Sequence, residues 1–246
     1  MTDFRACVVI PTFDNPRTIA AVVTRVREHI RDVVVVDDGS AEHARQIIVG
    51  LGDEGLAHVV RRDHNGGKGA AVKSGFRAAL ELGYTHALQV DADGQHTIDD
   101  IPRFLEAARR DPECLVLGAP SFDASVPKSR LYGRQITVLW THVETGGRVI
   151  SDPMCGFRVY PLAAALSCAP RADRMDFDPE IAVRMVWAGT RVLNLPTHVR
   201  YVSRAQGGVS HFQLVRDNVR ITLMHSRLVC LAALRMLFGR RLGALP

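Results

Sequence analysis

The sequence predicts an α/β fold built on a doubly wound, mostly parallel sheet with helices on both of its faces. The first half of the chain alternates short apolar runs with segments in which apolar residues recur at helical spacing. One apolar run, residues 33–36, is four consecutive valines, which is typical of a strand buried on both faces of a parallel sheet. This alternation favours a parallel sheet with right-handed crossovers.

The elements of the first half follow from this alternation. Strands are expected at residues 6–11, 33–36, 57–60, 85–90 and 114–117, and helices at residues 16–30, 41–51, 68–82 and 97–110. Ser40 is the expected N-cap of the second helix, and Gly83 is expected to end the third. Asp99 and Asp100 fall in the first turn of the fourth helix, where the helix dipole favours negative charge.

The second half of the chain is less regular. Helices are expected at residues 131–143 and 179–188, a strand at 191–195, and a loop followed by a strand within 150–160. Residues 213–238 are expected to form one long helix or two broken ones. We therefore divide the chain into a domain over residues 1–212 and a helical tail over residues 213–246.

The composition is that of a soluble globular protein. Of the 246 residues, 47% are hydrophobic and 23% are charged, which excludes collagen, coiled coil and disorder as overall classes. The longest stretch without a charged residue, residues 159–170, is shorter than the roughly 20 apolar residues of a membrane-spanning helix, so none is expected. The first residues do not resemble a signal peptide. Five scattered cysteines favour a reduced, cytoplasmic setting.

Positive charge is concentrated at the end of the chain. Residues 200–246 hold eight arginines against the single Asp217, whereas residues 1–199 are nearly neutral. Arg216, Arg220 and Arg227 fall within ~40° of one another on a helix. Together with the apolar residues that follow, they suggest a helix lying in an anionic membrane interface; a packed or solvated helix is the alternative. We expect a peripheral position on the inner face of the membrane and no nucleic-acid partner.

Polar clusters follow three of the expected strands, at the sheet edge where open α/β folds bind ligands. The most informative is Asp91, Asp93 and Gln95, whose side chains share one face of an extended segment. Two carboxylates ~6–7 Å apart beside an amide oxygen suit Mg²⁺ or Mn²⁺ bridging a diphosphate. A helix cap and turn would use the same residue types.

Two common nucleotide-binding motifs are missing. No GxGxxG follows the first strand, and the glycines at residues 66–69 do not have the spacing of a P-loop. A dinucleotide-dependent dehydrogenase and a P-loop phosphotransferase are therefore disfavoured. The loop at residues 65–69 can still hold an anion with its N–H groups and Lys68, or it is simply a tight strand-to-helix turn.

Six motifs follow one another between residue 6 and about residue 200. They are VVIPTFDN (8–15), VVVVDDGS (33–40), NGGKGAAVKSGF (65–76), VDADGQH (90–96), DPMCGFRVY (152–160) and FDPEI (177–181). In order and spacing they resemble the family 2 glycosyltransferases with the GT-A fold, and most of all the polyprenyl-phosphate sugar synthases. The resemblance implies an inverting, metal-dependent transfer of a sugar from a UDP- or GDP-sugar to a lipid-linked acceptor, in glycan biosynthesis of the cell envelope.

The resemblance also implies roles for individual residues. On the donor side it assigns the nucleoside pocket to Pro11, Phe13 and Asn15, base recognition to Asp38 with Asp37 adjacent, a donor phosphate contact to Lys68, the ribose to Asp91, and the metal to Asp91, Asp93 and Gln95. It places Arg134 and Asp152 on the acceptor or diphosphate side, and Asp178 and Glu180 near the acceptor.

The acceptor decides which further residues matter. A hydroxyl acceptor needs a general base, for which Asp152, Asp178 and Glu180 are the candidates. A phosphate acceptor needs no base but needs arginines, and Arg134, Arg158 and Arg204 are then the candidates. His211, in a Gly-rich loop, is a candidate for the metal or the diphosphate.

Three alternatives remain open from the sequence. The acceptor could be a non-lipid glycan or a small molecule. A sugar-phosphate nucleotidyltransferase shares the α/β alternation, but the GxGTRxxP-like loop expected of it after the first strand is missing. A non-catalytic relative that binds a nucleotide sugar is disfavoured by the intact set of Asp91, Asp93 and Gln95.

Overall fold

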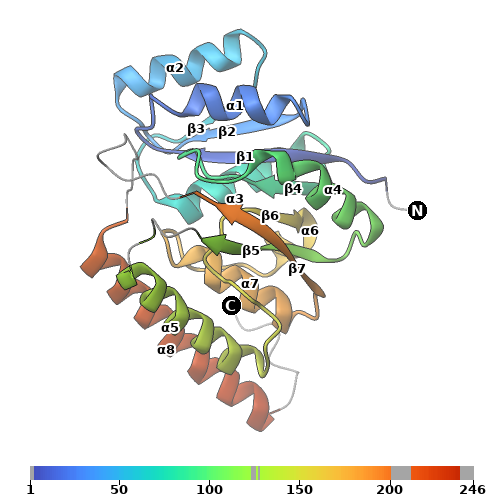
Figure 1. Cartoon of the computed structure of the whole chain (residues 1–246), viewed down its shortest axis with the longest axis vertical. Helices are drawn as coiled ribbons and strands as arrows, with labels where there is room; N and C mark the ends of the chain where they lie inside the picture. Colours follow the sequence, from blue (N-terminus) through green and yellow to red (C-terminus); the bar gives the residue numbers. More distant parts are fainter. Residues whose placement is uncertain (1–2, 123–125, 127, 201–211, 239–246) are drawn as a thin grey trace.

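The computed structural model describes residues 3–122, 126, 128–200 and 212–238 (Figure 1). The strands are β1 (Ala6–Thr12), β2 (Val33–Asp37), β3 (His58–Arg61), β4 (His86–Gln89), β5 (Leu115–Phe122), β6 (Arg158–Pro161) and β7 (Val192–Val199). The helices are α1 (Ile19–Arg27), α2 (Glu42–Asp53), α3 (Lys68–Glu81), α4 (Ile101–Arg110), α5 (Lys128–Thr145), α6 (Leu162–Ser167), α7 (Phe177–Trp187) and α8 (Leu214–Phe238), with the short 3₁₀ helix Ile98–Asp100 before α4.

These strands form one sheet in the order β3-β2-β1-β4-β6-β5-β7. Every pairing is parallel except those of β6, which runs antiparallel to both β4 and β5. The expectation of a mostly parallel sheet is therefore confirmed. The reversed strand follows α5 and the loop after it, in the half of the chain where the sequence loses its regular alternation.

Each face of the sheet has its own hydrophobic core. Alternation along β1 sends Val8 and Ile10 towards α1, α2 and α4, and sends Cys7 and Val9 towards α3, α6 and α7. The four valines of β2 divide in the same way between the two cores, which explains why all of them are buried. The expected helices on both faces are thus present (Figure 1).

Some boundaries and one cap differ from the expectation. Ser40 does not cap α2, whose N-cap position is Ala41. Its hydroxyl instead accepts a hydrogen bond from the Asp14 N–H (3.0 Å), and its own N–H donates to Asp37 (2.8 Å), so it joins the loops after β1 and β2. Gly83 does follow α3, with a φ of 82°.

Residues 214–238 form a single helix, α8, that packs beside α5 and α7 (Figure 1). Ile221, Met224 and Leu228 of α8 belong to the same core as α3 and α7. In length and composition alone, α8 could also cross a membrane. The sequence did not predict such a helix from its charge-free stretches, because Arg227 interrupts the apolar run of α8.

Candidate active site

A cavity of about 330 Å³ opens at the carboxyl edge of the sheet. Most residues singled out from the sequence line it: Pro11, Phe13, Asn15, Asp38, Lys68, Asp91, Asp93, Gln95 and Asp178. Five others do not line it, namely Asp37, Arg134, Asp152, Arg158 and Glu180. His211 and Arg204 lie outside the described residues. The segments that follow β1, β2, β3 and β4 therefore meet at one site, as expected for an open α/β sheet.

An ion-pair cluster forms the floor of the cavity. Lys68 Nζ, at the start of α3, lies 2.7 Å from Asp91 Oδ1 and 2.8 Å from Asp178 Oδ2. Although burial alone would lower the pKa of Lys68, the charges of Asp178 and Asp91 raise it above its usual range. Burial alone would raise the pKa of Asp91, but Lys68 and then His96, whose ring lies 3.4 Å away, hold that pKa well below its usual range. Asp91 is therefore an anion held in a fixed position.

Asp93 lies in the same cavity, and its carboxylate forms no ion pair with another of the described residues. Its Oδ1 accepts a hydrogen bond from the Gln95 N–H at 3.0 Å. Burial and the nearby charge of Asp91 raise the pKa of Asp93. The Gln95 carbonyl accepts a hydrogen bond from the Arg200 N–H (3.0 Å), which ties this segment to the end of β7. Asp93 is thus a carboxylate whose charge is poorly compensated.

The oxygen atoms of Asp91, Asp93 and Gln95 are the hard donors that Mg²⁺ and Mn²⁺ prefer. In the described part of the chain, no three His, Cys, Asp or Glu side chains converge into a metal-binding cluster. Such a cation usually takes only one or two carboxylates from the protein and the rest of its ligands from water and phosphate. The excess negative charge at Asp93 and the amide of Gln95 therefore fit a cation that arrives with a diphosphate.

Asp38 fixes the glycine loop before α3. Its carboxylate accepts hydrogen bonds from the N–H groups of Gly66 (3.1 Å) and Gly67 (2.7 Å), and it forms an ion pair with Arg62 Nε at 2.8 Å. These N–H groups are therefore not free to hold a ligand anion, so the alternative of a tight turn is the correct one for them. Gly67 is needed because its φ is 104° and because a Cβ there would lie 2.5 Å from Arg174 Cγ.

Two buried oxygens beside Pro11 and Phe13 have no hydrogen-bond partner among the residues that the structure describes. Thr12 Oγ1 and Asn15 Oδ1 are both inaccessible to solvent and make no hydrogen bond within the described residues. Both residues line the cavity beside Pro11 and Phe13. A buried oxygen without a partner is costly, so these two atoms favour a ligand that donates hydrogen bonds here.

Asp37 is a structural residue rather than a lining one. It is buried at the end of β2, where its Oδ2 lies 2.6 Å from Arg61 Nη1 and its Oδ1 accepts the Ser40 N–H.

Arg134 and Asp152 form a two-pronged ion pair next to the cavity, with Arg134 Nη2 2.8 Å from Asp152 Oδ1. Asp152 also accepts the N–H of Met154, which does line the cavity, so this pair shapes the wall.

Two of the candidates are buried among fixed partners. Glu180 is inaccessible to solvent and binds Arg184 (2.7 Å), Arg227 (2.5 Å) and the Ala172 N–H (2.6 Å). Arg158 is equally buried and donates to backbone carbonyls, including that of Asp178 at 2.7 Å. Neither residue lines the cavity, so Glu180 is not positioned there as a base and Arg158 is not positioned there as a phosphate ligand.

Arg158 was expected to be a candidate phosphate ligand in the cavity, but other arginines line it instead. Arg174, Arg216 and Arg220 line the cavity, the last two from the first turns of α8. The sequence did show Arg216 and Arg220 on one helical face, but it suggested that this face meets a membrane. Arg174 had no local signal, because it lies in an irregular segment between α6 and α7.

Comparisons with known proteins agree with this geometry. A profile of glycosyl transferase family 2 matches residues 7–161. The undecaprenyl-phosphate mannosyltransferase of Micrococcus luteus is 29% identical over 220 residues, which cover 82% of this chain and 86% of that protein. The UDP-N-acetylglucosamine–dolichyl-phosphate N-acetylglucosaminyltransferase of Methanococcus voltae is 28% identical over 196 residues, covering 72% and 78%.

A solved structure shares the fold. Glucosyl-3-phosphoglycerate synthase of Mycobacterium tuberculosis, crystallised with Mn²⁺ and UDP-glucose, superposes with a TM-score of 0.65 at 15% identity. The superposition covers 94% of this chain and 79% of that one. The expected GT-A fold is thereby confirmed.

Proposed function

The chain belongs to glycosyl transferase family 2 and is a glycosyltransferase, and from this premise we propose that it transfers a sugar, with inversion, from a nucleoside-diphosphate donor to a polyprenyl phosphate or a related lipid-linked acceptor. The names of the relatives from M. luteus and M. voltae both specify a polyprenyl phosphate acceptor, whereas the sugars differ. The acceptor class is therefore better supported than the identity of the sugar.

We place the nucleoside of the donor against Pro11, Phe13 and Asn15. The buried oxygens of Thr12 and Asn15 are available to accept hydrogen bonds from a base or a ribose. Asp38 supports this pocket indirectly, because it holds the loop at Gly66 and Gly67 in place.

Asp91, Asp93 and Gln95 would hold Mg²⁺ or Mn²⁺ together with the donor diphosphate. When bound, the cation would neutralise the charge that develops on the leaving diphosphate. Lys68 keeps the Asp91 carboxylate ionised and oriented towards this position. The presence of Mn²⁺ with UDP-glucose in the mycobacterial structure supports the same choice of ligand.

The state of the carboxylates favours a phosphate acceptor over a hydroxyl acceptor. Asp178 is held by Lys68 and by Gln89 Nε2 (3.2 Å), and Asp38 is held by Arg62 and the loop N–H groups. None of the three candidate bases, Asp152, Asp178 and Glu180, is thus a free carboxylate, since each is paired with a cation. A phosphate oxygen is already an anion and needs none, and arginines line the cavity to receive it.

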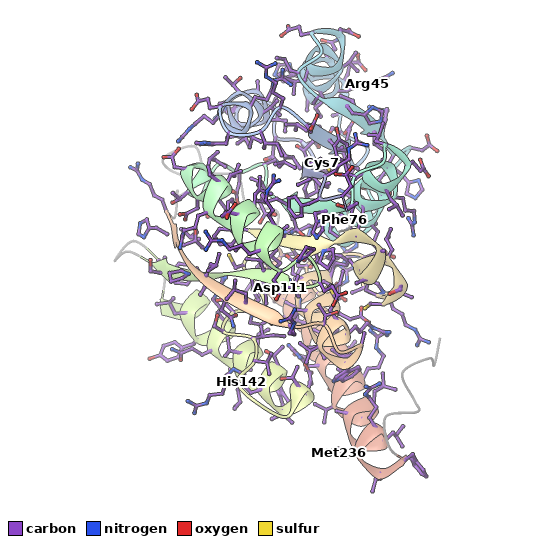
Figure 2. All side chains as sticks on the ribbon, turned by 90° about the vertical axis from the view of Figure 1, so that its right-hand side faces the viewer. Cys7, Arg45, Phe76, Asp111, His142 and Met236 are labelled. Carbon is purple, nitrogen blue, oxygen red and sulfur yellow. The ribbon has the colours of Figure 1, made fainter. Side chains whose placement is uncertain are left out.

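Exposed apolar side chains on α5 and α8 support a lipid partner. On α5 they are Tyr132, Ile136, Leu139, Trp140 and Val143, and on α8 they include Val215, Val219, Leu223, Leu234, Met236, Leu237 and Phe238. On α5 the spacing makes one stripe; on α8 Val215, Val219 and Leu223 make a second stripe, and the other exposed side chains gather around the last turn of the helix. The two helices lie side by side. Met236 lies at the far end of α8, away from the sheet (Figure 2).

We therefore propose that these two stripes, rather than the arginines of α8, rest in the interface of a membrane on its cytoplasmic side. Arg216 and Arg220 line the cavity, and Arg220 and Arg227 pair with Asp217 and Glu180, so this face of α8 is turned towards the cavity and its partners. Apolar side chains flanked by Tyr and Trp are typical of interfacial helices. The cavity begins at the first turns of α8, so an interfacial α8 would bring it close to a lipid phosphate.

The observation that carries the proposal is that Asp91, Asp93 and Gln95 share one cavity with three arginines. The test incubates the purified chain with UDP- and GDP-sugars labelled in the sugar, Mn²⁺, and a short-chain polyprenyl phosphate. We expect labelled sugar to become extractable into organic solvent, with release of a nucleoside diphosphate. Asp93→Asn should abolish transfer, and Asp99→Asn, which changes an exposed carboxylate outside the cavity, serves as the matched control. Transfer only to soluble acceptors would refute the lipid acceptor.

A further inference from the structure

A second cavity, of about 430 Å³, lies between residues 171–176 and α8. Arg171, Arg174, Arg220 and Arg227 line it, and Arg174 and Arg220 also line the main cavity. The two cavities therefore meet at these two side chains. We propose that this second cavity, which we call the arginine groove, binds a phosphate monoester and presents its phosphate to the donor at Arg174 and Arg220. The inference rests on the proposed function, because it names the site of the phosphate acceptor.

The charges of the groove favour an anion. Asp173, one of its acidic residues, is paired with Lys73 at 2.6 Å. Asp217, which lines only the main cavity, accepts the Gln213 N–H and lies 3.4 Å from Arg220, at the long end of an ion pair. Arg174 is bound only to the neutral Asn65 side chain, at 3.3 Å, among the described residues. Asp176, the other acidic residue of the groove, accepts the backbone N–H of Arg174 at 3.2 Å. In the described contacts, no carboxylate therefore pairs with the Arg174 guanidinium, and Arg220 has only the long contact to Asp217.

The wall that carries Arg174 is rigid. Lys73 Nζ donates to the carbonyls of Pro170 and Ala172, and the Ala70 N–H donates to the carbonyl of Asp173 at 2.9 Å. The close approach of Arg174 to Gly67 fixes the same segment against the start of α3. Because the backbone that carries Arg174 is held in this way, it needs little further ordering when the side chain binds a ligand.

Glu180 joins this wall to the opposite one. Its buried carboxylate accepts the Ala172 N–H from the wall of residues 171–176 and binds Arg227 of α8. The acid that the sequence suggested as a base thereby holds the two sides of the groove at a fixed separation. Arg171 and Arg227 then lie towards the part of the groove that is remote from the main cavity, since neither lines that cavity.

The chemistry of a phosphate monoester matches this arrangement. A guanidinium can pair two of its N–H groups with two phosphate oxygens, which a hydroxyl acceptor would not offer. A phosphate oxygen at the junction forms the bond to the anomeric carbon of the donor. The bond between that carbon and the diphosphate breaks, and its electron pair leaves with the nucleoside diphosphate. No proton has to be removed, because the attacking oxygen carries none.

The test measures binding without a donor and turnover with one. Calorimetry with geranyl phosphate and with glycerol 3-phosphate compares wild type with Arg174→Gln and Arg220→Gln. We expect each variant to bind about 10- to 100-fold more weakly, as for the loss of one charge-assisted contact, and Arg→Lys at the same positions to recover part of the affinity. Arg110→Gln, on α4 and paired only with Glu106, is the matched control for the loss of one exposed arginine.

The outcomes separate the possible sources of the phosphate. Tighter binding of geranyl phosphate than of glycerol 3-phosphate supports the groove with a lipid ligand, and equal binding supports it with a soluble ligand. Equal affinities of wild type and both Gln variants would overturn the groove. In turnover, the KM for the acceptor should rise more than the KM for the donor. Transfer by the Gln variants with an unchanged acceptor KM would refute the arginine groove as the acceptor site but leave the proposed function intact. Binding that depends on the arginines, without any sugar transfer, would refute the proposed function but leave the groove as a phosphate site. Unfolding curves establish that each variant is folded.

Discussion

Replacing Glu180 by glutamine should destabilise the protein rather than remove a catalytic base. The Glu180 carboxylate is fully buried and receives donors from Arg184 (2.7 Å), Arg227 (2.5 Å) and the Ala172 N–H (2.6 Å). Glutamine has nearly the same shape, but it leaves two buried guanidinium contacts without their counter-charge. Disrupting a buried ion pair in this way costs about 3–5 kcal/mol.

That loss is large enough to measure directly. For a chain of this size, 1 kcal/mol shifts the melting temperature by roughly 2–4 °C, so the variant should melt roughly 6–20 °C lower. Thermal and urea unfolding, followed by circular dichroism, give the value. Glu106→Gln, which removes a half-exposed carboxylate paired with Arg110, is the control and should change stability by less than about 1 kcal/mol.

The same variant distinguishes the two roles of Glu180 by its kinetics. A positioning residue should leave the pH profile of kcat unchanged in shape, because no titrating group of the reaction has been removed. If Glu180→Gln kept its melting temperature but lost turnover and the acidic limb of that profile, Glu180 would be the general base after all, and the assignment of a structural role would be refuted.

Three further predictions concern the metal ligands, the apolar stripes and the thiols. Asp93→Asn should lower kcat/KM by at least ~100-fold and weaken Mn²⁺ binding measured by calorimetry with a nucleoside diphosphate, whereas activity within a few-fold of wild type would contradict the metal site. Ile136→Glu combined with Leu139→Glu should weaken vesicle binding by at least about 100-fold, since each apolar side chain contributes ~1.5–3 kcal/mol when buried and 1.4 kcal/mol is a factor of about ten; flotation that disappears with salt in the wild type would indicate charge instead. In native protein at pH 8, iodoacetamide should modify the exposed Cys230 but not Cys7, because burial, then the charge of Asp32, raises the pKa of Cys7 to about 12; mass spectrometry finding Cys7 alkylated before unfolding would contradict its burial.

Much of the donor half could be predicted from the sequence because its signals are local. Alternation of apolar strands and helices fixes which faces of the sheet are covered, and a parallel sheet brings the carboxyl ends of its strands to one edge. Asp91, Asp93 and Gln95 follow a strand directly, so their place in the cavity depends on little more than the end of β4. The same holds for Pro11 at the end of β1 and for Phe13 and Asn15 directly after it.

The roles of individual charged residues were decided by tertiary contacts. From the sequence, Lys68 looks like a phosphate ligand and the glycines beside it like an anion loop, but Asp91 and Asp178 hold the ammonium and Asp38 takes the loop N–H groups. Whether a carboxylate is a base or an anchor depends on which donors surround it, and those donors come from distant segments. Glu180 illustrates this, since Arg227 lies 47 residues further along the chain.

The acceptor side depended on the tertiary structure most of all. The sequence by itself determined that α8 carries Arg216, Arg220 and Arg227 on one face, because helical periodicity fixes relative directions around an axis. It did not determine what that face meets, because the docking of a helix is set by packing with non-local partners such as α5 and α7. Only the folded chain turned the arginines towards the cavities and left the apolar stripe outside. The buried side of the helix is the one that completes the core with Ile221, Met224 and Leu228.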